Sequence, residues 1–291
     1  MKIGVASINW WNHLIPLPQA DRPSPDAVLD QVKTAGYAGV EVGDALPTTV
    51  ETLKPLLQTR RLQLAAGFWP TWLLSKPYEE QESAFLDFLN VLAAMGTSVL
   101  FVAEYTYTIT SSLAQNLFPY QLPTLNPAQW QTLGEGLAKF QRLAEDRGLK
   151  FAYHPLAGTI VQEPWQIERL LEAWPDLGLV LDTGHLALVG ADPLAFMDTY
   201  LGRIVHIHLK NVRPEMVKRV QTEPFPWRWA LIDGIFTVPG DGGIDFRPIL
   251  EKIENTGYQG WLIVEAEQDP YKANPFLYAR LAREYLKEVI G

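Results

Sequence analysis

Short apolar runs alternate along the chain with longer segments whose apolar residues recur at helical spacing. Eight runs have the length of buried strands, and a helix-like segment follows each of them. The predicted strands cover residues 3–8, 39–43, 62–68, 98–103, 150–154, 177–181, 204–208 and 261–265. The predicted helices cover residues 24–36, 50–59, 79–95, 126–147, 164–174, a segment that opens at 192, 246–256 and 275–289. This strand-then-helix order favours a parallel sheet covered by helices.

Eight strands and eight helices are what a closed (β/α)8 TIM barrel requires. The alternative, an open doubly wound sheet, would normally carry a glycine-rich phosphate loop after its first strand. The segment SINWWNH at residues 7–13 contains no glycine. No internal repeat or linker interrupts the chain, so we expect one barrel domain over residues 1–291.

Composition narrows the class of protein. The chain is 47% apolar and has a formal net charge of −9, from 24 Lys and Arg against 33 Asp and Glu. Without a basic cluster, a nucleic-acid partner is disfavoured. The absence of cysteine excludes disulfides and thiolate metal sites. No apolar stretch reaches the roughly 20 residues that span a bilayer, and the N-terminus lacks the core of a signal peptide. We therefore expect a cytoplasmic protein with no membrane partner.

Four residues with metal-binding side chains stand at the ends of four successive predicted strands. They are His154, Asp182, His208 and Glu265. The carboxyl ends of barrel strands form one ring, so these side chains are expected to converge. A single histidine at a strand end is more often structural, but four such groups together favour a cation, because burying unpaired charges is costly. Two imidazoles and two carboxylates suit Mn²⁺, Co²⁺, Fe²⁺ or Zn²⁺.

Other polar residues near these strand ends have two possible roles each. His206 shares a strand face with His208 and is either a partner of the ligands or part of the core. His185 is a candidate hydrogen-bond partner of a substrate or a proton donor. Lys210 and Glu267 are either residues of the barrel rim or groups that move protons. Glu41 and Glu104 either bind substrate hydroxyls or pair with an arginine.

Aromatic residues gather in the segments that follow the strands. They are Trp10, Trp11, Phe68, Trp69, Trp72, Trp227 and Trp229. Among them, Trp10 and Trp69 are the candidate walls against which a sugar or cyclitol ring would stack. The long connection at residues 105–125 has the length of a lid or binding loop. A second segment, residues 214–243, is expected to be irregular.

Five motifs carry a resemblance to a known family. They are YHPLAGT at 153–159, LDTGH at 181–185, HIHLKNVRP at 206–214, VPGDGGIDF at 238–246 and GWLIVEAEQDP at 260–270. With them, nearly the whole chain resembles the xylose-isomerase-like TIM barrels, the sugar isomerase/epimerase superfamily. The last two motifs, with Lys272 and Pro275, are most similar to the inosose dehydratase branch. Three positions depart from the relatives: His154 stands where the epimerases have Glu, and Leu156 and Asn211 often correspond to His and Asp.

The resemblance implies one divalent metal, usually Mn²⁺ or Co²⁺ with Mg²⁺ also possible, held at the positions of His154, Asp182, His208 and Glu265. It implies a lyase that removes water from a keto-cyclitol, 2-keto-myo-inositol, to give a cyclic dione. Glu265 or Glu267 would then remove a proton, and Lys210 or His185 would protonate the leaving hydroxyl.

Several alternatives remain open at this point. One is a ketose 3-epimerase or hydroxypyruvate-type isomerase acting on a small polyol or ketose. Another is a polyol-binding barrel without turnover. A phosphodiesterase of the endonuclease type is disfavoured by the acidic charge. The resemblance also leaves a homo-oligomer open.

Overall fold

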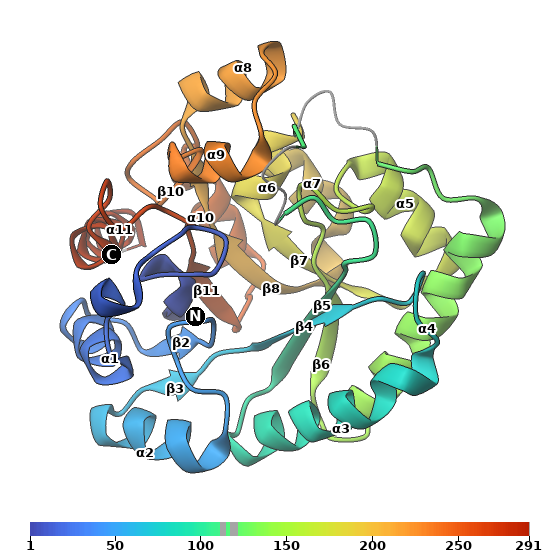
Figure 1. Ribbon diagram of the computed structural model, residues 1–291, viewed down its shortest axis with the longest axis horizontal. Helices are drawn as coiled ribbons and strands as arrows, with labels where there is room; N and C mark the ends of the chain where they lie inside the picture. The colour runs from blue at the N-terminus through green and yellow to red at the C-terminus, as the bar shows by residue number, and fades with distance from the viewer. Residues whose placement is uncertain (111–114, 117–121, 291) are drawn as a thin grey trace.

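A computed structural model describes residues 1–110, 115–116 and 122–290 (Figure 1). Within these residues, nine strands form one sheet in the order β3-β2-β1-β11-β8-β7-β6-β5-β4, and every pair in it is parallel. The strands are β1 (Lys2–Ala6), β2 (Gly39–Glu41), β3 (Gln63–Leu64), β4 (Gly67–Thr71), β5 (Val99–Glu104), β6 (Lys150–Tyr153), β7 (Gly178–Asp182), β8 (Ile204–Leu209) and β11 (Trp261–Val264).

The sheet closes into a barrel at the third predicted strand, which is interrupted. Its first part, β3, pairs with β2, and its second part, β4, pairs with β5. Ala65 and Ala66 lie between the two parts, and the Ala65 N–H still bonds to the carbonyl of Val40 at 3.0 Å. Nine strand segments thus occupy eight barrel positions, and the predicted (β/α)8 barrel is confirmed.

The eight predicted helices are present, and most of them surround the strands (Figure 1). They are α1 (Pro25–Thr34), α2 (Val50–Arg60), α3 (Tyr78–Ala94), α4 (Pro127–Glu145), α5 (Pro164–Ala173), α7 (Pro193–Tyr200), α10 (Phe246–Asn255) and α11 (Pro275–Ile290). Single 3-10 turns cover Ser7–Asn9, Gln19–Asp21 and Leu201–Arg203. Among the described helices, none is long and apolar enough to cross a membrane.

Additional elements follow two of the strands. They are α6 (Thr183–Leu188), β9 (Asn211–Val212), α8 (Pro214–Thr222), α9 (Trp227–Ile232) and β10 (Phe236–Thr237). The prediction that residues 214–243 are irregular is therefore wrong. Pro214 occupies the first position of α8, and Met216 and Val220, one turn apart, are both buried. Two turns are too short for this apolar spacing to stand out in the sequence.

Helix α4 shows why these segments become helices. Asn126 and Gln129 form a capping box at its start, with Pro127 as the first helical residue. Its largest buried apolar side chains, which include Leu133 and Phe140, belong to the large core cluster. The apolar stripe and the N-terminal cap thus both favour a helix in this segment, and this helix connects the neighbouring parallel strands β5 and β6.

Candidate metal centre

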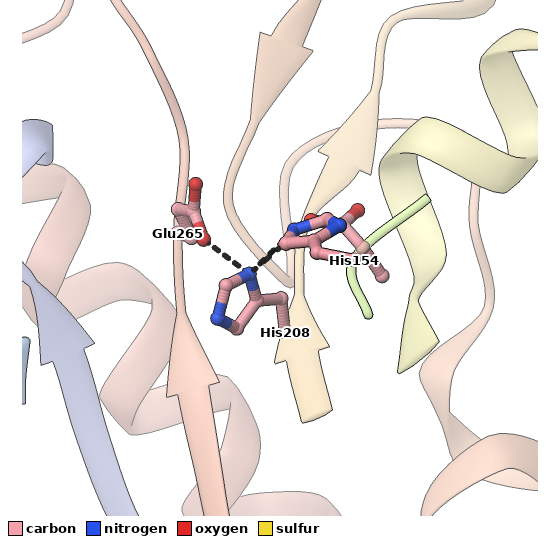
Figure 2. Close-up of side chains that lie close together, drawn as sticks. His154, His208 and Glu265 are labelled. Atoms are coloured by element: carbon pink, nitrogen blue, oxygen red, sulfur yellow. Dashed lines mark hydrogen bonds and ion pairs between the residues drawn. The ribbon is translucent and has the colours of Figure 1, made fainter. Parts of the chain in front are cut away.

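The four predicted ligand residues meet at one end of the barrel. His154 follows β6, Asp182 ends β7, His208 lies in β8 and Glu265 follows β11; Asp182 pairs in register with His208. One nitrogen or oxygen of each lies within 4.8 Å of the others, and all four side chains are buried. Figure 2 shows His208 between His154 and Glu265. The structure thus brings together residues that are up to 111 positions apart in the chain, from 154 to 265.

Three of the distances within this metal quartet, His154, Asp182, His208 and Glu265, are close to those expected around a single divalent ion, and the fourth, from Glu265 to His208, is shorter. His154 Nε2 lies 3.2 Å from His208 Nδ1, and Asp182 Oδ2 lies 3.6 Å and 3.5 Å from these two nitrogens. Ligands about 2.1 Å from an ion are about 3.0 to 3.5 Å apart. Glu265 Oε2 is 2.5 Å from His208 Nδ1. Asp182 Oδ2 and Glu265 Oε2 make no hydrogen bond of regular geometry to the described residues, so both oxygens are available to a cation.

Asp182 is placed by its second role as a helix cap. Its Oδ1 accepts a hydrogen bond from the backbone N–H of His185 at 2.9 Å, which starts α6 directly after β7. This bond turns Oδ2 towards the quartet. The motif LDTGH therefore encodes a strand, a cap and one metal-directed oxygen within five residues.

The electrostatics of the quartet are dominated by burial and by neighbouring charges. Burial raises the pKa of Asp182, but the positive charges of Lys210 and His185 outweigh it and hold that pKa well below its usual value. Burial, together with the charge of His208, lowers the pKa of His154 to about 4. A deprotonated carboxylate and a neutral imidazole are the forms that bind metals.

Lys210 is a fully buried ammonium next to the quartet. Its Nζ lies 2.9 Å from Glu267 Oε2, 3.1 Å from Glu265 Oε1 and 3.6 Å from Asp182 Oδ2. It also sits 4.6 Å from the centre of the Phe236 ring. Burial lowers the pKa of Lys210, yet the three carboxylates outweigh burial and raise it above its usual value. The lysine is therefore not a solvated residue of the barrel rim.

His185 lies beside this lysine. Its Nδ1 accepts a hydrogen bond from the backbone N–H of Ala157 at 3.2 Å, and its Nε2 is 3.1 Å from Lys210 Nζ. The ring contacts Phe236 and His154 edge-on. Burial and the charge of Lys210 lower the pKa of His185.

Gly184 makes room for Lys210. A Cβ at this position would lie 2.5 Å from Lys210 Cγ. We expect Gly184→Ala to lower the free energy of unfolding by about 1–3 kcal/mol, because the added methyl overpacks a buried side chain. Chemical denaturation would measure the change. Gly202→Ala is the matched control, since nothing lies within 4 Å of its added Cβ; equal losses in the two variants would contradict this explanation.

A cavity of about 500 Å³ opens onto three residues of the quartet, His154, His208 and Glu265. Its lining includes Asn12, His13, Glu41, Asp44, Phe68, Tyr105, His154, Leu156, His208, Glu265 and Glu267. Its size is that of small-molecule sites, and its walls combine apolar surface with a few polar groups. Asn12 and His13 were not predicted as site residues. Their position shortly after the first predicted strand could have identified them, because site residues of a barrel follow the carboxyl ends of its strands.

Glu41 has histidine partners in place of a predicted arginine. Its Oε1 lies 2.5 Å from His206 Nε2, and its Oε2 lies 3.3 Å from His208 Nε2. Burial raises the pKa of Glu41, but the two histidines outweigh it and lower that pKa to about 2. His206 is thus a partner of a ligand residue through Glu41, one of its two predicted roles.

Glu104, Trp10 and Trp69, the other candidate substrate-binding residues, are not among the described residues that line the cavity. Glu104 is fully buried and accepts hydrogen bonds from Thr71 Oγ1 at 2.8 Å and from the Leu73 N–H at 2.9 Å, so its carboxylate holds β4 to β5. Trp10 is buried in the core and donates to Gln31 of α1 at 2.6 Å. Trp69 packs on aromatic rings of α3. Strand alternation turns Trp69 outwards and Phe68 inwards.

The predicted lid is described only in part. Residues 111–114 and 117–121 of the 105–125 connection lie outside the described residues. Tyr105, at its start, lines the cavity. Near its middle, the carbonyl of Gln115 accepts a hydrogen bond from the Trp227 N–H at 2.9 Å. The start of this connection thus contributes to the cavity wall, and Gln115 is hydrogen-bonded to the first residue of α9.

A model of the family described as xylose isomerase-like TIM barrel matches residues 29–289. This match covers most of the chain. The chain belongs to this family. The resemblance expected from the five motifs is therefore confirmed.

Relatives from several bacteria are similar over almost their whole length. The chain is 39% identical to the inosose dehydratase of Clostridium beijerinckii, covering all of this chain and 98% of the relative. It is 40% identical to the inosose dehydratase of Lacticaseibacillus casei, covering 98% of this chain and 96% of the relative.

Solved structures of low sequence identity share the fold. The crystal structure of IolI with a zinc atom has a TM-score of 0.71 at 16% identity, covering 100% of this chain and 98% of the other. D-allulose 3-epimerase from Methylomonas sp. with D-allulose has a TM-score of 0.69 at 16% identity, covering 99% and 97%.

Proposed function

We propose that the protein is an inosose dehydratase, a divalent-metal-dependent hydro-lyase that removes water from 2-keto-myo-inositol to give a cyclic dione. The observation that carries this proposal is the buried metal quartet with Lys210 and Glu267 beside it, next to a cavity of about 500 Å³ that His154, His208, Glu265 and Glu267 help to line. The identity of 39–40% to proteins named inosose dehydratase, over nearly the full chain, supports the choice of substrate.

His154, Asp182, His208 and Glu265 would hold the metal. We propose Mn²⁺ or Co²⁺ as the native ion, while Fe²⁺, Zn²⁺ and Mg²⁺ are compatible with nitrogen and oxygen donors. When bound, the ion would polarise the ketone of the substrate and stabilise the negative charge that develops on its oxygen.

Glu267 is the proposed proton acceptor. It lines the cavity and lies outside the metal quartet, whereas Glu265 is committed to it. Burial, reinforced by the charge of Glu265, raises the pKa of Glu267. A carboxylate of raised pKa is a stronger base at neutral pH. Glu267 would take the proton from the carbon next to the ketone, and the C–H electron pair would form a carbon–carbon double bond.

Lys210 is the proposed proton donor for the leaving hydroxyl. The ketone then re-forms, the carbon–carbon double bond moves to the β carbon, and the β carbon–oxygen bond breaks, so that the oxygen leaves with its electron pair and takes a proton from the Lys210 ammonium. Water is thereby released, and the enol that remains becomes the dione when its hydroxyl proton moves to the carbon that lost the oxygen. The proton on Glu267 then returns to Lys210 across 2.9 Å, which restores both groups. His185, whose Nε2 lies 3.1 Å from Lys210 Nζ, is the alternative donor of this proton.

Cavity residues outside the quartet would bind the cyclitol. Asn12, His13 and Asp44 are polar groups on one side of the lining, and Phe68 and Leu156 supply apolar surface for the C–H faces of a ring. We propose a small keto-cyclitol or related polyol as the partner. The cytoplasm as its location and a homo-oligomer as its assembly are further proposals.

The decisive experiment supplies purified protein with Mn²⁺ and 2-keto-myo-inositol. We expect the dione absorbance to rise and the product to be one water lighter than the substrate by mass spectrometry. A product of unchanged mass would instead indicate the epimerase or isomerase alternative. Tight binding without any product, with each divalent metal tested, would indicate a polyol-binding barrel. Either result overturns the dehydratase proposal.

A further inference from the structure

Glu41 reaches His208 from the side opposite the metal quartet. Glu41 ends β2, whereas His208 lies in β8, and β1 and β11 separate these two strands in the sheet. The side chain therefore crosses the barrel interior. It is 5% exposed, and His208 is 1% exposed. A carboxylate buried this deeply needs hydrogen-bonding or charged partners, because burying an unpaired charge is costly.

The two ring nitrogens of His208 face different groups. Nδ1 faces the quartet, while Nε2 lies 3.3 Å from Glu41 Oε2. An imidazole that gives the lone pair of one nitrogen to a cation carries its proton on the other, and an acceptor for that proton fixes the ring. Nε2 makes no hydrogen bond of regular geometry to the described residues, and Glu41 is the carboxylate that faces it.

His206 anchors Glu41 through its other oxygen. His206 Nε2 lies 2.5 Å from Glu41 Oε1, and its Nδ1 has no hydrogen-bond partner among the described residues. A buried Nδ1–H without an acceptor would be unfavourable, so the proton of the neutral ring belongs on Nε2. His206 therefore donates to Glu41. The ring of His206 is itself stacked on Phe101 with an interplanar angle of 17°.

We propose that Glu41 is a positioning residue of the metal centre. It accepts the Nε2 proton of His208 and so presents Nδ1 to the cation, while His206 fixes the carboxylate. Both oxygens of Glu41 are then used by histidines, which argues against its predicted role in binding substrate hydroxyls. The inference rests on the proposed function only in requiring a metal at the quartet.

Metal affinity tests this role independently of turnover. We expect Glu41→Gln and Glu41→Asp to weaken Co²⁺ binding by about 10- to 100-fold, the usual cost of losing such a partner. The first variant removes the charge, and the second keeps the charge but shortens the side chain. Competition with a coloured chelator measures the dissociation constant, and the visible spectrum of bound Co²⁺ reports the geometry of the ligands.

Glu104→Gln is the matched control. Glu104 is another buried carboxylate at a strand end, but its hydrogen bonds go to Thr71, Leu73 and Thr106 and to no histidine. This control should lose stability and keep its affinity for Co²⁺. Unchanged affinity in both Glu41 variants, or an equal loss in the control, would overturn the proposal.

A measurement on the unaltered protein keeps the test decisive if the Glu41 variants do not fold. In ¹⁵N-histidine spectra of the Zn²⁺-loaded protein, we expect slowly exchanging Nε2–H signals from His206 and His208 and an unprotonated Nδ1 in His208. A His208 protonated on Nδ1 would refute the proposal. Metal binding that depends on Glu41 without dehydration would count against the proposed function alone.

Discussion

Glu267→Gln should lower kcat for dehydration by about 10²- to 10⁴-fold, the contribution typical of a general acid–base group. The amide has nearly the shape of the carboxylate but cannot accept a proton. Because Glu267 lies outside the metal quartet, Co²⁺ affinity should not change. Steady-state kinetics with 2-keto-myo-inositol, together with a metal titration, measures both quantities.

Two results would count against this role of Glu267. The first is a variant that keeps its kcat, which would assign the proton transfer to Glu265. The second is a loss of metal together with turnover, which would make Glu267 part of the metal centre. Glu104→Gln serves as control here too, because the described hydrogen bonds of its carboxylate go to Thr71, Leu73, Leu74 and Thr106, which do not line the cavity.

His154→Ala should remove turnover by removing metal. The variant loses one of two nitrogen donors of the quartet, so its Co²⁺ affinity should fall by more than the roughly 100-fold upper range expected for a residue that only supports a ligand. The control is His13→Ala, whose imidazole lines the same cavity but has a side chain that is 71% exposed.

The comparison of the two variants decides the point. Turnover by His154→Ala should stay at the level of a metal blank when metal and protein are equimolar. His13→Ala should keep the metal and show its effect in KM. A tight metal site in His154→Ala would mean that the quartet is not the centre proposed here.

The fold and the convergence of the quartet were predictable because both depend on local patterns. Apolar runs and caps such as Asn126 locate strands and helices, and the closure of parallel strands brings their ends together whatever their distance in sequence. The positions of His154 and Asp182 at the ends of predicted strands were sufficient to predict that these residues lie together.

Contacts across the barrel were not predictable in the same way. Nothing in the sequence near Glu41 indicates that it meets His206, because β2 and β8 are not neighbours. In the sequence, Glu104 is equivalent to Glu41, because both stand at the ends of predicted strands. In the structure, the Glu104 carboxylate accepts hydrogen bonds from Thr71 and from backbone N–H groups. The prediction assigned Trp69 to the inner face of the barrel, but successive residues of a strand point to opposite faces, and Phe68 is the one that faces inwards.

The pairing of β1 with β11 joins the first and the last strand of the sheet, with Lys2 opposite Trp261. Translation must therefore reach the last strand before the first one gains its second neighbour. Until then β1 and β8 keep open edges, and such edges recruit other strands. Since Glu265 directly follows β11, a nascent chain would acquire its fourth metal ligand only at this late stage. Binding of a metal by all four residues would thus follow the pairing of β11 with β1 and β8, a contact between segments far apart in the sequence.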